Sequence, residues 1–141
     1  MASIVVGVDR SETSRKAAER AATLARDLGA DLHLVMYAER AKGVRMSVGS
    51  DTFHSDWLSD ARQFLEDLGR QLPLENVTAS VGEGDPASAI CEEAERLDAE
   101  LIVIGNKRVQ GLARVLGSVA GDVMKQAHCD VYVANTTIDE S

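Results

Sequence analysis

The chain has 141 residues, of which 45% are hydrophobic and 27% charged, with a formal net charge of −8. This length fits one domain, residues 1–141, and the composition is typical of a folded soluble protein. The excess of acidic residues disfavours nucleic-acid binding, and no apolar stretch is long enough to predict a membrane span.

The start of the chain predicts a cytoplasmic protein. Met1-Ala2-Ser3 runs directly into an apolar segment, without the basic region or the cleavage site of a signal peptide. Cys91 and Cys129 lie far apart and form neither a CxxC pair nor a metal cluster, which is compatible with a reducing compartment.

Short apolar runs alternate with helical patterns from the first residues onward. Residues 3–8 and 31–39 have the character of buried strands. Between them, Ser11 is placed to cap a helix that Gly29 ends. The polar residues 40–53 predict a connection after the second strand.

The second half of the chain continues this alternation. An apolar stripe predicts a helix over residues 54–72, and residues 76–81 read as a third strand, weakened by Thr78 and Ser80. Asp85-Pro86 is the sequence of a helix start. A fourth strand, a fourth helix, a fifth strand and a polar tail are expected at residues 101–104, 118–128, 130–135 and 136–141.

This order predicts a doubly wound α/β domain, with five parallel strands in the order 3-2-1-4-5 and helices on both faces. In such sheets, ligands bind at the carboxyl ends of the strands, where the strand order reverses. The first and fourth strands should flank that point.

The segment from Leu101 to Val119 predicts a phosphate site at this position. A strand that ends at Gly105 lets a ligand approach the backbone, and Gly117-Ser118 opens a helix whose N–H groups attract an anion. The loop between them carries Lys107, Arg108 and Arg114 and contains no acidic residue. A nucleotide is the expected ligand.

The chain resembles the universal stress protein family over nearly its whole length. The resemblance rests on Val6-Gly7-Val8-Asp9, on Gly84-Asp85-Pro86-Ala87, and on the block from Gly105 through Gly117-Ser118-Val119 to Cys129-Asp130-Val131. It implies a Rossmann-like fold related to the adenine nucleotide alpha hydrolases, and a stress-response protein that binds an adenine nucleotide. ATP, with Mg²⁺, is the expected ligand, and AMP, ADP and cyclic AMP are the alternatives.

The resemblance also implies roles for individual residues. Asp9 and the backbone around Gly7 and Val8 would meet the adenine or ribose, and Tyr37 would line the adenine pocket. Ile104 and Gly105 would pass the ribose and α-phosphate. The remaining implied contacts are to phosphate, from Asn106, Lys107, Gly117, Ser118 and Val119.

Two positions depart from the family pattern of ATP-binding members. Arg108 replaces the second motif glycine, and the spacer from there to Gly117 has eight residues instead of nine. Arg10 stands where the family commonly has glycine. Arg108 would either block the triphosphate or grip it with its guanidinium, and the first case predicts a nucleotide-free interaction module of the same fold.

The absence of several catalytic motifs from the sequence limits the enzyme activities that we expect. The sequence contains no P-loop, no GxGxxG after the first strand and no GxSxG elbow. Without a base near the γ-phosphate, we expect no enzyme, or at most a very slow ATP hydrolase. The apolar edge Val131–Ala134 of the last strand predicts a homodimer, as does the family resemblance.

Overall fold

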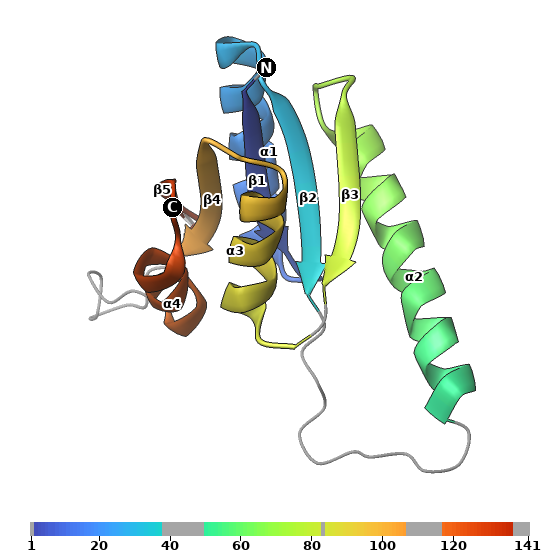
Figure 1. The fold of residues 1–141 in the computed structure, drawn as a ribbon. Coiled ribbons are helices and arrows are strands. Elements are labelled where there is room, and N and C mark those ends of the chain that lie inside the picture. Colours follow the sequence, from blue (N-terminus) through green and yellow to red (C-terminus); the bar gives the residue numbers. More distant parts are fainter. Residues whose placement is uncertain (1, 38–49, 83, 107–116, 137–141) are drawn as a thin grey trace, which may run out of the picture.

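A five-stranded parallel sheet forms the centre of the computed structural model, which describes residues 2–37, 50–82, 84–106 and 117–136 (Figure 1). Its strand order, β3-β2-β1-β4-β5, confirms the predicted topology and fold class. The strands are β1 (Ser3–Val8), β2 (Asp31–Tyr37), β3 (Val77–Gly82), β4 (Leu101–Asn106) and β5 (Asp130–Asn135).

Four helices cover the two faces of this sheet. They are α1 (Glu12–Leu28), α2 (Ser50–Gln71), α3 (Pro86–Arg96) and α4 (Ser118–Gln126). Helices α1 and α2 pack on one face and share one apolar core, whereas α3 and α4 share a second core on the opposite face, which is turned toward the viewer in Figure 1. The chain therefore leaves the neighbouring strands β1 and β4 toward opposite faces.

Helix α1 lies close to the sheet because its buried face is made almost entirely of alanine. As predicted, Ser11 caps its start by accepting the Ser14 N–H, and Gly29 ends it with a left-handed φ of 67°. Small side chains let a helix backbone approach a sheet without leaving voids. The alanines of this face are Ala17, Ala18, Ala21, Ala22 and Ala25.

Several predicted boundaries were wrong. Helix α2 begins at Ser50, so residues 50–53 belong to the helix and not to the connection. The apolar stripe begins only at Trp57 and carries no information about the turns before it, although Ser and Asp are favoured at helix starts. At the other end of the chain, α4 ends at Gln126, because Ala127 has extended backbone angles.

The end of β4 also differs from the prediction. The strand runs two residues further, with Gly105 and Asn106 paired in register to Ala134 and Asn135 of β5. Thr136, expected in the polar tail, is buried, and its N–H donates to the Asn106 carbonyl oxygen (3.4 Å). Pairing with β5 therefore extends β4 past Gly105, where we expected the strand to end.

Residues 38–49, 107–116 and 137–141 lie outside the described residues, and with them most of the predicted connection and tail. In the described ranges, every helix is too short or too polar to span a bilayer.

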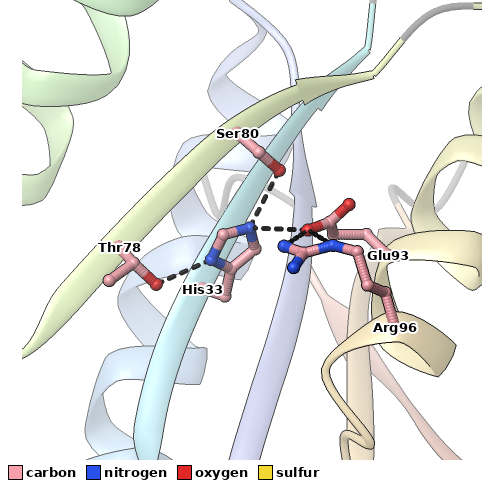
Figure 2. A network of polar contacts seen from close by, with 5 residues as sticks. All are labelled: His33, Thr78, Ser80, Glu93 and Arg96. Atoms are coloured by element: carbon pink, nitrogen blue, oxygen red, sulfur yellow. Dashed lines mark hydrogen bonds and ion pairs between the residues drawn. The ribbon is translucent and has the colours of Figure 1, made fainter.

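A polar network crosses the sheet face beneath α3 (Figure 2). The buried imidazole of His33 on β2 places Nδ1 2.6 Å from the Thr78 hydroxyl and Nε2 2.8 Å from the Ser80 hydroxyl, both on β3. Nε2 also lies 3.5 Å from the carboxylate of Glu93 on α3, which is paired with Arg96. Thr78 and Ser80, which weakened the strand prediction, are therefore the partners of a buried histidine.

We predict that this network makes the fold acid-sensitive. Burial lowers the pKa of His33 below its ordinary value of 6.5, with Glu93 opposing the shift and Arg96 adding to it. Since the folded state prefers neutral His33, its stabilising effect is complete above pH 6.5 and is lost as the pH falls through the lowered pKa. Urea unfolding between pH 8 and 5 should show this loss.

The variant His33→Gln is the matched control, because its amide keeps polar contacts to the two hydroxyls but does not titrate. Its stability should depend less steeply on pH over this range. Equal slopes for the two proteins would show that His33 does not carry the effect.

Candidate functional site

A cavity of about 290 Å³ opens at the carboxyl ends of β1 and β4. Helix α1 begins on one side of it and α4 on the other, so the cavity lies at the predicted switch point. Its lining consists of Gly7, Asp9, Ser11, Thr13, Ser14, Tyr37, Ile104, Gly105, Asn106, Gly117, Ser118, Val119 and Ala120.

Most of the residues singled out from the sequence are brought together here. The structure places nine of them in the cavity wall: Gly7, Asp9, Tyr37, Ile104, Gly105, Asn106, Gly117, Ser118 and Val119. Val8 is not in the wall, since its side chain is fully buried in the core beneath α1. Lys107, Arg108 and Arg114 lie outside the described residues.

At one end of the cavity, Asp9 is held in a fixed orientation by hydrogen bonds. One carboxylate oxygen accepts the Ser11 N–H (2.7 Å) and lies 2.9 Å from the Ser14 hydroxyl. The other accepts the Tyr37 hydroxyl at 3.4 Å. Ser14 also accepts the Asp9 N–H (2.9 Å), so backbone and side chain are both fastened to the start of α1.

These hydrogen bonds determine the protonation state of Asp9. Burial acts to raise the pKa of the carboxyl group, but the bonds from Ser11, Ser14 and Tyr37 together outweigh it and hold the pKa below 3.8. Asp9 is therefore a carboxylate at neutral pH. It can accept a hydrogen bond from an amino or hydroxyl group of a ligand, and it is a weak base.

The first turn of α4 forms the other end of the cavity. The N-cap is Gly117, and no side chain of the described residues caps the turn. Asn106 accepts the Gly117 N–H through its Oδ1 (2.7 Å), which fastens the end of β4 to the start of α4. The amides of Ser118, Val119 and Ala120 precede the first intrahelical N–H donor, that of Gly121.

The chemistry of this turn suits an anion. The first turn contains no acidic residue, and the helix dipole places positive potential at its uncapped N–H groups. The exposed hydroxyl of Ser118 lies in the same turn. Asn106, which we expected to contact phosphate, accepts the Gly117 N–H through Oδ1 and so fixes the position of this turn.

The two strand glycines of the site are required by packing. A Cβ on Gly7 would lie 2.4 Å from Cδ1 of Ile90 on α3. At Gly105 it would lie 3.0 Å from the Thr13 carbonyl oxygen and 3.1 Å from Thr136 Cγ2. A side chain at Gly105 would therefore crowd Thr13 and Thr136, while Gly105 itself lines the cavity.

Sequence reasoning missed four lining residues, namely Ser11, Thr13, Ser14 and Ala120. Ser11 was assigned only a capping role. Ser14 resembles an ordinary polar residue of a first helical turn, but it is buried and holds Asp9 at both its amide and its carboxylate. The spacing Asp-x-Ser-x-x-Ser after a buried strand is the available signal for it.

A doubly wound sheet with an uncapped helix N-terminus at its switch point places this chain in the class of Rossmann-like α/β proteins. Residues 1–135 match the universal stress protein family, and the chain belongs to that family. A universal stress protein of Methanocaldococcus jannaschii is 33% identical over 92% of this chain and 79% of its own length.

Solved structures show the same fold. A universal stress protein from Archaeoglobus fulgidus in complex with dAMP is 25% identical and covers 94% of this chain and 97% of its own, with a TM-score of 0.57. Another universal stress protein, in complex with cAMP, is 23% identical and covers 96% of this chain and 97% of its own, with a TM-score of 0.65.

We predict opposite effects of alanine at two glycines of this fold. Gly7→Ala should destabilise the protein by about 1–3 kcal/mol, because the new methyl group would overlap Ile90 in a fully buried layer. Gly121→Ala, inside α4 with nothing within 4 Å, should stabilise it by up to about 1 kcal/mol. Urea unfolding measures both; a neutral Gly7→Ala would contradict the packing role.

Proposed function

We propose that this chain binds an adenine nucleotide in the cavity between β1 and β4 and acts as a regulatory protein of the stress response. One observation carries the proposal: a fixed carboxylate and a helix start that no described side chain caps both line one cavity. A nucleotide has matching chemistry, with hydrogen-bond donors on its base and ribose and negative charge on its phosphate.

In this arrangement, Asp9 would accept a hydrogen bond from the adenine amino group or from a ribose hydroxyl. Tyr37 lies beside it and offers a ring surface to the base. The amides of Ser118, Val119 and Ala120 would bind a phosphate. The dAMP bound by the Archaeoglobus relative belongs to this ligand class, as does the cAMP bound by the other neighbour.

Our preferred ligand is ATP, with AMP, ADP and cyclic AMP as the alternatives. Mg²⁺ would come with the triphosphate: no group of three or more His, Cys, Asp or Glu in the described parts of the chain suits a metal ion. We expect no fast hydrolysis, since Asp9 is a weak base and the sequence lacks a P-loop.

A nucleotide-free interaction module is the second candidate, and the sequence observation that favours it is Arg108 in place of the motif glycine. If Arg108 blocks the site, Arg108→Gly should create ATP affinity that the natural chain lacks. Equal affinity of the two proteins would remove this candidate.

We also propose a homodimer through β5. Among the described strands it pairs only with β4, and it carries the exposed Tyr132 between half-buried Val131 and Val133. Sedimentation at micromolar concentration should give about twice the 15.1 kDa chain mass. A stable single-chain species would contradict the dimer.

The nucleotide proposal predicts saturable binding of AMP, cyclic AMP or ATP with Mg²⁺ in calorimetry. At about 100 times its dissociation constant, a ligand should stabilise the fold by roughly 2.7 kcal/mol, which raises the melting temperature by several degrees. Absence of both heat and stabilisation for all of these nucleotides would overturn the proposal.

Asn106→Asp distinguishes the phosphate end of the site from the base end. The aspartate side chain has the same shape and still accepts the Gly117 N–H, but it adds a negative charge beside α4. Affinity for AMP should fall about tenfold or more, whereas affinity for uncharged adenosine should change little. Equal losses for both ligands would mean that the phosphate does not bind at α4.

A further inference from the structure

Arg10 links the cavity to a helix that does not line it. The residue stands between Asp9 and Ser11, which both line the cavity. Its guanidinium carbon lies 5.1 Å from the ring centroid of Phe64 on α2, a cation–π contact. Of the two positions that depart from the family pattern, Arg10 is the one whose contact the structure describes.

Helix α2 is placed to respond to this contact. In Figure 1 it extends past the arrowheads of β2 and β3, toward the same end of the sheet at which the cavity opens. Its C-terminal half is anchored in the core by buried Leu65 and Leu68. Phe64 is half-buried within this anchored part, between buried Ala61 and Leu65.

The β1–α1 loop is thereby held from two sides. Ser14 of α1 binds the amide and the carboxylate of Asp9, and Phe64 of α2 holds the next residue, Arg10. A ligand that contacts Asp9 therefore also acts on the β1–α1 loop, which contacts both α1 and α2.

We propose that Arg10 is a positioning residue that couples occupancy of the nucleotide site to helix α2 through Phe64. The proposal rests on the nucleotide-binding function proposed above and adds the effect that bound nucleotide has on α2. Coupling free energies are reciprocal. If the contact with α2 favours the loop conformation that binds the base, then bound nucleotide must in turn strengthen the contact and steady α2.

The test is a double-mutant cycle in nucleotide affinity. Phe64→Leu keeps an apolar side chain and every charge, and exposed Arg10 can be changed to Ala without disturbing the core. Each change alone should weaken binding of AMP and of adenosine by about two- to fivefold, the usual strength of an exposed cation–π pair. The double variant should bind no more weakly than the weaker single variant.

Two further variants isolate the cause. Arg10→Lys keeps the charge but loses the planar stack, so its affinity should fall between those of the natural chain and Arg10→Ala. Trp57→Leu, one heptad away on α2, should combine additively with Arg10→Ala. Additive effects of Arg10→Ala and Phe64→Leu on nucleotide affinity, or no loss of affinity in either single variant, would overturn the coupling.

Hydrogen exchange provides the reciprocal measurement. AMP should slow exchange of the amides around Phe64 in the natural chain by about the same two- to fivefold, and not in Arg10→Ala. If the natural chain binds neither AMP nor adenosine, the proposed function fails and the coupling falls with it. If it binds but α2 amides exchange unchanged, only the coupling is wrong.

Discussion

The site is defined by the connections that follow β1 and β4. They leave the carboxyl ends of these strands toward opposite faces of the sheet. After β1 the chain enters α1 on one face, and after β4 it continues to α4 on the other. Since the two strands are neighbours, a gap must open between their ends. The hydrogen bond from Gly117 to Asn106 then fixes the start of α4 at this gap, and Ser14 fixes Asp9 on the opposite side.

Periodicity and capping signals were enough to predict this framework. The strand order follows from alternating apolar runs and from helix signals at Ser11 and Asp85, whereas the family resemblance supplied the roles of the nine site residues that line the cavity. Contacts between side chains distant in sequence were not predictable. The partners of His33, Thr78 and Ser80, are more than forty residues away and meet it only through strand pairing.

The glycines show that a motif residue can line the cavity and also be constrained by packing. Gly105 appeared necessary for ligand access, yet the nearest atoms in the direction of a side chain belong to Thr13 and Thr136. Gly117 has an ordinary φ of −64°, which any residue adopts, and it matters as an uncapped helix start. The same family pattern thus meets a packing requirement at Gly105 and, at Gly117, places a residue without a side chain at the start of α4.

Backbone amide NMR during titration with AMP tests the central claim most directly, because it reports on each end of the cavity separately. The amides of Ser118, Val119 and Ala120 should shift with those of Asp9 and Gly105, and the first three should respond much less to adenosine. Shifts confined to another surface, or identical responses to both ligands, would contradict a nucleotide site between β1 and α4.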